Sequence, residues 1–88
     1  MPFYIYILRT SANTLYTGQT NNLAKRIEEH KSKTSRSSKY IRSFSSFELV
    51  HTESYATRKE AMQREFQIKQ LTKARKEALI ARSKDVYK

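Results

Sequence analysis

The sequence predicts a single α/β (α+β) domain in which a small three-stranded antiparallel sheet is flanked by helices, in the order β-β-α-(α)-β-α-α. Two observations lead to this prediction. Short β-rich runs occur twice near the N-terminus and once in the middle of the chain, and helical patterns follow them. The chain has 88 residues, which is enough for one domain with a modest core.

The first two elements are expected to form a β-hairpin. Residues 3–9 (FYIYILR) predict a strand, residues 10–13 a turn, and residues 14–20 (TLYTGQT) a second strand. Both faces of the first strand carry large side chains, so we expect the sheet to be covered on both sides. If Tyr6 and Tyr16 lie opposite each other, both side chains emerge on the same face, and a slip of one residue separates them.

The remaining elements follow from capping residues and apolar periodicity. Asn21 or Asn22 is expected to cap a helix that ends near residue 31. The later elements are expected as a loop over 32–46 with room for a short helical turn at 39–42, a strand over 47–54, and helices over 57–71 and 73–82. We place the domain at residues 1–83 and a flexible C-terminal tail at 84–88.

Charge is the strongest feature of the composition. The chain has 18 Lys and Arg against 8 Asp and Glu, a net charge of +10. Residues 21–42 contain seven basic and two acidic side chains, and residues 57–88 contain ten basic and four acidic ones. Clustered positive charge of this kind favours a nucleic-acid partner, although a solvated basic surface is the simpler alternative.

The composition also excludes some classes of protein. There is no cysteine, so neither a disulfide scaffold nor a thiolate zinc site is available, and the chain suits a reducing compartment. We find no secretory leader and no segment long enough to span a bilayer, so we expect a cytoplasmic protein without membrane contact.

Glu65 is an acidic residue within the apolar arc expected for the 57–71 helix. That helix begins with a capping box, Thr57 and Glu60. At about 100° per residue, its apolar side chains spread over one broad side, and Glu65 projects among them. This arc comprises Ala61, Met62, Phe66, Ile68 and Leu71. A carboxylate placed there needs a positive partner. The partner is either Lys69, through an i,i+4 ion pair, or a metal ion.

Arg26 and His30 are expected to share one face of the 22–31 helix. They are four residues apart, and Leu23 and Ile27 form the adjacent apolar row that faces the sheet. For each residue alone there is a simpler interpretation. Arg26 would be a solvated charge, and His30 would be a helix-end residue that interacts with free carbonyl groups. Their shared face instead indicates that both side chains point toward the sheet.

Together these motifs resemble the GIY-YIG nuclease superfamily, and in particular a small stand-alone bacterial group of mostly uncharacterised members. The resemblance rests on YIYIL, LYTG, a basic helix, SKYIR and the later EAxxRExxIKxL, and it runs from about Phe3 to Arg82. Tyr4 stands where the name motif has Gly, and Thr17 where it has Ile. A supporting asparagine found in many family nucleases has no counterpart in the C-terminal part of this chain.

The resemblance implies a role for each matching residue. Glu65 would hold a single Mg²⁺ (or Mn²⁺), Arg26 would contact the scissile phosphate, and Tyr16 would act as general base or orient the attacking water. Tyr6 would be the partner tyrosine and His30 a histidine near its hydroxyl, while Gly18 would allow close approach of backbone and substrate. The SKY-R stretch would add substrate contacts through Lys39, Tyr40 and Arg42. The alternative is that this stretch is a plain surface turn.

Three functions remain open from the sequence. The first is a metal-dependent nuclease that acts on DNA or structured nucleic acid. The second is a nucleic-acid-binding module of the same fold with weak or no catalysis. The third is a basic adaptor that docks on an acidic protein or ribonucleoprotein. We expect a monomer whose target choice comes from its own basic surface or from a protein partner.

Overall fold

The computed structural model describes residues 2–32 and 44–86. Lys39, Tyr40 and Arg42 lie outside this part of the chain, as does the helical turn expected near them. The described elements are β1 (Phe3–Thr10), β2 (Leu15–Thr20), α1 (Leu23–Ser32), β3 (Phe47–Tyr55), α3 (Arg58–Gln70) and α4 (Lys73–Val86). This order confirms the predicted fold. The predicted boundary at residue 83 falls within α4, which continues to Val86.

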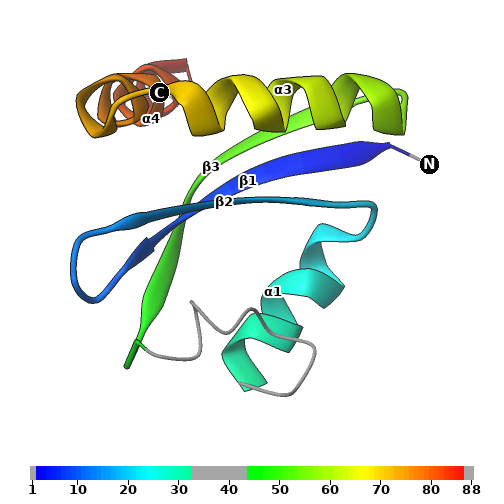
Figure 1. The fold of residues 1–88 in the computed structure, drawn as a ribbon. Coiled ribbons are helices and arrows are strands. Elements are labelled where there is room, and N and C mark those ends of the chain that lie inside the picture. The colour runs from blue at the N-terminus through cyan, green and yellow to red at the C-terminus, as the bar shows by residue number, and fades with distance from the viewer. Residues whose placement is uncertain (1, 33–43, 87–88) are drawn as a thin grey trace.

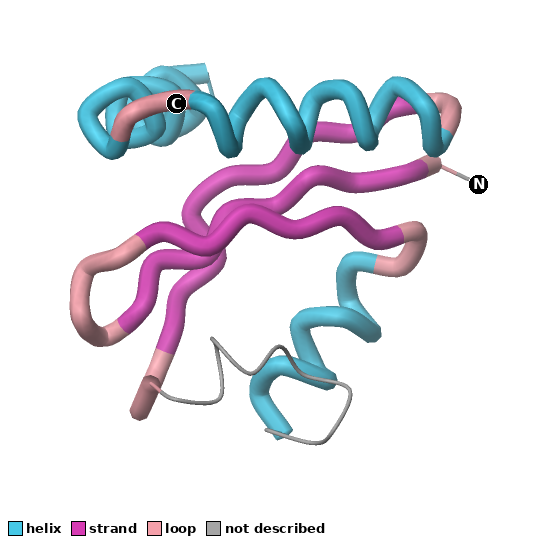
Figure 2. Tube along the Cα trace, viewed as in Figure 1, coloured by secondary structure: helices cyan, strands magenta, loops and turns pink. Residues whose placement is uncertain are grey.

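The sheet is antiparallel, with the strand order β2-β1-β3. Helices α3 and α4 cover one face and α1 lies against the other (Figure 1). Figure 2 shows the same layers, with the sheet between the helices. The covering of both faces, expected from the large side chains of the first strand, is therefore confirmed.

Each face of the sheet has its own apolar cluster. On the α3 and α4 side, Ile5 and Ile7 pack with Ala61, Ile68 and Ile80. On the α1 side, Tyr6 and Leu8 pack against half-buried side chains that include Tyr16, Leu23, Ile27 and Phe47. The alternation of side chains along β1 divides its residues between these two clusters.

The hairpin register differs from the expected one by two residues. Tyr6 lies opposite Gly18, and Tyr16 lies opposite Leu8. The turn is centred on Ala12, where the Thr10 amide donates to the Thr14 carbonyl at 2.9 Å and Asn13 takes a positive φ of 62°. Because the offset is an even number of residues, Tyr6 and Tyr16 still point to the same face.

A polar network joins β3 to α3 on the face opposite α1. Glu53 accepts hydrogen bonds from the Arg64 Nε at 2.8 Å and Nη2 at 3.1 Å, and from the Tyr55 hydroxyl. The Glu53 Oε2, which accepts from the Arg64 Nη2, also lies 2.7 Å from the His51 Nε2. Glu53 therefore fixes the side of α3 that faces β3.

Helix α3 begins as predicted, but its apolar arc is narrower than expected. Thr57 caps the helix by accepting from the Glu60 amide at 3.2 Å. Ala61 and Ile68 are fully buried, whereas Met62 is 52% and Phe66 66% exposed. Met62 and Phe66 thus lie on a side of α3 that no described element covers. Glu65 lies at the border of the buried side, with 24% of its side chain exposed.

The length and hydropathy of the described helices show whether any of them could span a membrane. Across residues 2–32 and 44–86, each helix falls short of the length and apolar character that a bilayer-spanning segment requires.

Candidate functional site

The hydroxyl of Tyr6 is the centre of a polar cluster between the sheet and α1. The Arg26 Nε donates to this oxygen at 3.4 Å, and the His30 Nε2 lies 3.1 Å from it. Tyr6 is 1% exposed and His30 is fully buried. The phenol donates to His30 when the imidazole carries its proton on Nδ1, and accepts from it when the proton is on Nε2. The expected shared face of Arg26 and His30 is therefore real.

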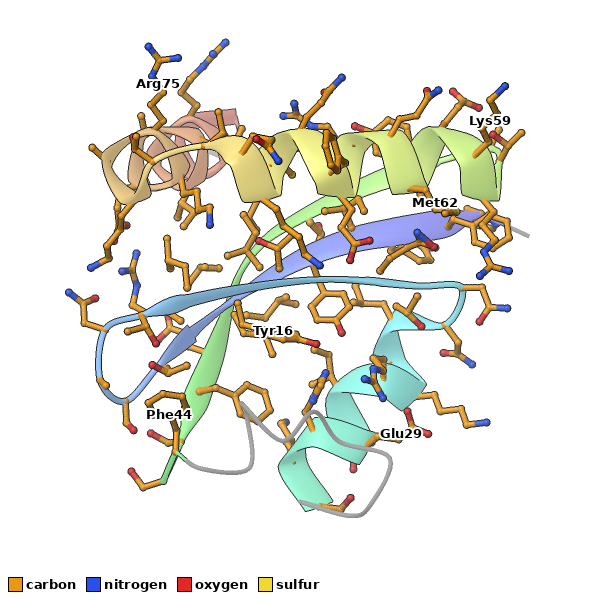
Figure 3. The ribbon with its side chains drawn as sticks, viewed as in Figure 1. Tyr16, Glu29, Phe44, Lys59, Met62 and Arg75 are labelled. Atoms are coloured by element: carbon orange, nitrogen blue, oxygen red, sulfur yellow. The ribbon has the colours of Figure 1, made fainter. Side chains whose placement is uncertain are left out.

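Tyr16 completes the aromatic part of this cluster. Its ring centroid lies 6.3 Å from that of Tyr6 and 5.8 Å from that of His30. Phe47 of β3 also packs against the His30 ring, edge to face, with a centroid distance of 6.0 Å. Tyr16 is half-buried on the edge strand β2. Figure 3 shows its side chain below β2, on the side of the sheet where α1 lies. Tyr16 is therefore the more accessible of the two phenols.

Burial determines the protonation of the central groups. It raises the pKa of Tyr6 to about 12, and this effect outweighs the opposing hydrogen bond from Arg26. Burial also lowers the pKa of His30, and the nearby charge of Arg26 lowers it further. At neutral pH, Tyr6 is therefore a neutral phenol and His30 a neutral imidazole.

Arg26 is the positive charge of the cluster. Burial works against its charged form, but hydrogen bonds to Tyr6 and Glu29 outweigh that effect and raise its pKa. The Glu29 carboxylate accepts from the Arg26 Nη1 at 3.2 Å. A quarter of the Arg26 side chain is exposed, so an anion from solvent can reach the guanidinium. Glu29 was not singled out from the sequence, although its i,i+3 spacing from Arg26 is a usable signal.

Gly18 makes room for the Tyr6 ring. A Cβ built on Gly18 would meet the Tyr6 Cε1 at 2.9 Å, with the Cζ and hydroxyl oxygen closer still. The group that lies close to Gly18 in the structure is the phenol of Tyr6, and the expected approach of substrate there stays a prediction.

Glu65 approaches the cluster from the other helical layer. It lies on α3, and its negative charge is one of the minor contributions that raise the pKa of Tyr6 after burial. The predicted ion pair with Lys69 is present, with 3.5 Å between the Lys69 Nζ and a Glu65 carboxylate oxygen. Among residues 2–32 and 44–86, no hydrogen bond is recorded between Glu65 and the Tyr6, Arg26 or His30 side chains.

The donor set at Glu65 fits one mode of magnesium binding. No group of three or more His, Cys, Asp or Glu side chains in the described part of the chain is arranged to hold a metal. Glu65 is a single carboxylate that is partly open to solvent. Mg²⁺ is often held by one or two carboxylates together with substrate phosphates and water, so this arrangement is compatible with it.

The fold and the Tyr6–Arg26–His30 cluster agree with the family that the sequence matches. The sequence matches the GIY-YIG catalytic domain over residues 2–78. The chain belongs to the GIY-YIG family.

Its relatives are small proteins of the UPF0213 group. The chain is 45% identical over 78 residues to a UPF0213 protein from Natronomonas pharaonis, with 89% of each chain covered. It is 43% identical over 77 residues to one from Oceanobacillus iheyensis, with 88% of this chain and 87% of the relative covered. The group includes archaeal as well as bacterial proteins.

A solved structure has the same fold. The solution NMR structure of a UPF0213 protein from Bacillus halodurans aligns with a TM-score of 0.60 and 36% sequence identity. The alignment covers 92% of this chain and 84% of the other. The relatives are thus similar to this protein over most of their length, and the predicted membership of the superfamily is confirmed.

Proposed function

We propose that this protein is a nuclease that hydrolyses phosphodiester bonds in DNA, with one Mg²⁺ or Mn²⁺ held at Glu65. One observation carries the proposal, namely the hydrogen-bonded chain from Arg26 through Tyr6 to His30, with Tyr16 packed beside it. Membership of a family whose domain is described as catalytic supports it. The net charge of +10 supports a polyanionic substrate.

In this proposal Arg26 binds the scissile phosphate. Its guanidinium is charged, partly exposed and held in place by Tyr6 and Glu29. A fixed positive charge stabilises the negative charge that develops on the phosphoryl oxygens during the reaction. Because burial keeps Tyr6 neutral, we assign it to orienting Arg26 and not to accepting a proton.

Tyr16 is assigned to the attacking water. Its phenol is half-buried at the edge of the sheet, adjacent to the Tyr6 and His30 rings. The water oxygen attacks phosphorus while the P–O bond to the leaving oxygen breaks. The water proton passes to the Tyr16 oxygen, which releases its own proton to solvent, and the leaving oxygen takes a proton from solvent. A metal bound at Glu65 would supply further charge neutralisation at the phosphate when present.

The test is cleavage of plasmid and branched DNA with Mg²⁺ or Mn²⁺, and with EDTA in place of the metal. The Glu65→Ala variant is compared with Glu28→Ala, which removes an exposed carboxylate from α1 instead. We expect nicking that requires both the metal and Glu65 and that persists in the Glu28→Ala variant.

The other outcomes identify the alternatives. Salt-sensitive binding of DNA without any cleavage would replace the nuclease with a nucleic-acid-binding module. Absence of binding at low salt would favour an adaptor that docks on an acidic protein. Cleavage that is equally strong after the Glu65→Ala substitution would refute the metal site.

A further inference from the structure

A basic depression lies beside Tyr16, where the edge strand β2 meets the end of α3 and the start of α4. Its volume is about 320 Å³, roughly ten times the share of liquid volume that one water occupies. The depression is lined by Leu15, Tyr16, Thr17, Lys69 and Lys76. It therefore has room for a tetrahedral anion, and it begins at a residue of the candidate site.

The two lysines of this depression differ in their partners. Lys69 is paired with Glu65 at 3.5 Å. Lys76 is half-buried, and no ion pair is recorded for it among residues 2–32 and 44–86. Its neighbour Glu77 does not neutralise it, because that carboxylate accepts from the Arg9 Nη1 at 2.7 Å and lies 3.9 Å from the Lys73 Nζ.

The wall of the depression also contains an unsatisfied hydroxyl. Thr17 is 6% exposed, and its Oγ1 is buried without a hydrogen-bond partner in the part of the chain that the structure describes. A hydroxyl in this state favours an acceptor oxygen, because a buried polar group without a partner is costly. Lys76 thus favours an anionic ligand, and Thr17, which lines the same depression, carries a hydroxyl that no described group uses.

We propose that this depression is a second phosphate subsite, in which Lys76 binds a backbone phosphate that flanks the scissile one. The proposal deepens the nuclease function and rests on it for the identity of the ligand. Tyr16 lies on the edge strand β2 and lines the depression, while its ring packs against the Tyr6 and His30 rings of the candidate site. One nucleic-acid strand that crosses Tyr16 would therefore place successive phosphates near Arg26 and near Lys76.

The test measures binding of a fluorescent DNA duplex in EDTA, over a series of salt concentrations. Lys76→Gln is compared with Arg75→Gln, which removes the same charge from the adjacent position of α4. Arg75 is exposed and points away from the sheet, as Figure 3 shows. We expect the Lys76→Gln substitution to weaken binding about tenfold and to lower the salt slope by about 0.9. We expect the Arg75→Gln substitution to change binding by less than about twofold. Lys76→Arg, which keeps the charge, should retain most of the affinity.

Two results would overturn the subsite. One is an equal loss of affinity in the Lys76→Gln and Arg75→Gln variants, and the other is absence of DNA binding by the unmodified protein at low salt. Because the measurement is made without metal, it is independent of cleavage. A protein that binds DNA through Lys76 but never cleaves it would keep the subsite and refute the nuclease.

Discussion

The phenol of Tyr6 lies across the Cα of Gly18, its partner in the β1–β2 pair. This contact leaves no space for a Cβ at Gly18, and it directs the Tyr6 hydroxyl toward Arg26 and His30. The only glycine of the chain thus determines where the central hydroxyl of the candidate site lies.

The first prediction concerns this contact. A Gly18→Ala substitution should push the Tyr6 ring away and destabilise the protein by about 1–3 kcal/mol, the usual cost of overpacking a core. Urea unfolding measures the change. Combination with Tyr6→Leu, which removes the overlapping ring atoms, should make the two costs less than additive. Strict additivity would show that the new methyl group does not meet Tyr6.

The second prediction concerns Tyr16 in cleavage. Under the proposed function, Tyr16→Phe should slow cleavage at least about 100-fold, because it removes the group that handles the proton of the attacking water. The affinity for DNA in EDTA should stay within about twofold. Tyr4→Phe is the matched control, since Tyr4 is a half-buried tyrosine of the adjacent strand, and it should leave cleavage unchanged. A fully active Tyr16→Phe variant would exclude the assigned role.

The third prediction concerns the protonation of His30. The pKa of His30 is lowered in the folded protein, by burial and then by Arg26. Protonation therefore favours the unfolded chain, whose histidines titrate near pH 6.5. The contribution of His30 to stability should be complete above about pH 6.5 and should decrease as the pH falls below it.

NMR titration of the imidazole protons tests whether the pKa of His30 is lowered in the folded protein. The His30 signals, assigned with a His30→Gln variant, should keep the shifts of a neutral ring down to about pH 6.5. The protein has only two histidines, so the assignment is simple. A His30 midpoint above 6.5 in the folded protein would contradict the buried neutral imidazole.

The fourth prediction concerns Glu53. Burial alone would raise its pKa, but the hydrogen bonds from His51, Arg64 and Tyr55 outweigh burial and lower it to about 2. The stabilisation by Glu53 is therefore complete above the unfolded value of about 4.3 and is lost as the pH falls toward 2. At pH 7 this stabilisation amounts to about 3 kcal/mol.

Chemical unfolding as a function of pH measures the effect. Glu53→Gln should lower the free energy of unfolding at pH 7 and flatten its decrease between about pH 4.3 and 2. Glu28→Gln, on the exposed side of α1, should preserve that decrease. An equally steep acid transition in the Glu53→Gln variant would assign the transition to other carboxylates.

Much of the fold could be predicted because β1 carries large side chains on both faces and Thr57 marks the start of α3. The hairpin register was harder to predict from the sequence. A two-residue offset leaves Tyr6 and Tyr16 on the same face, so side-chain alternation does not distinguish the two registers. The turn centred on Ala12 decides between them, through hydrogen bonds made by Thr10.

The apolar arc of α3 was predicted too broadly for a related reason. Helical periodicity places the apolar residues Met62 and Phe66 on the same broad side of the helix as Ala61. Whether they are buried depends on a neighbouring element that covers them. The cluster around Tyr6 was anticipated because Arg26 and His30 share a helix face. The spacing of Lys76 and Thr17 gave no comparable signal, since they meet only where β2, α3 and α4 converge.

The two apolar clusters lie on opposite sides of one thin sheet, and each supports a different half of the candidate site. Ala61 and Ile68 anchor the helix that carries Glu65, while Leu23 and Ile27 anchor the helix that carries Arg26. A substitution in either cluster can therefore shift one half against the other without unfolding the chain. Such a variant would keep the spectrum of the folded protein, but Glu65 and Arg26 would no longer be aligned. Assays of folding and assays of activity would therefore report different tolerances to the same substitution.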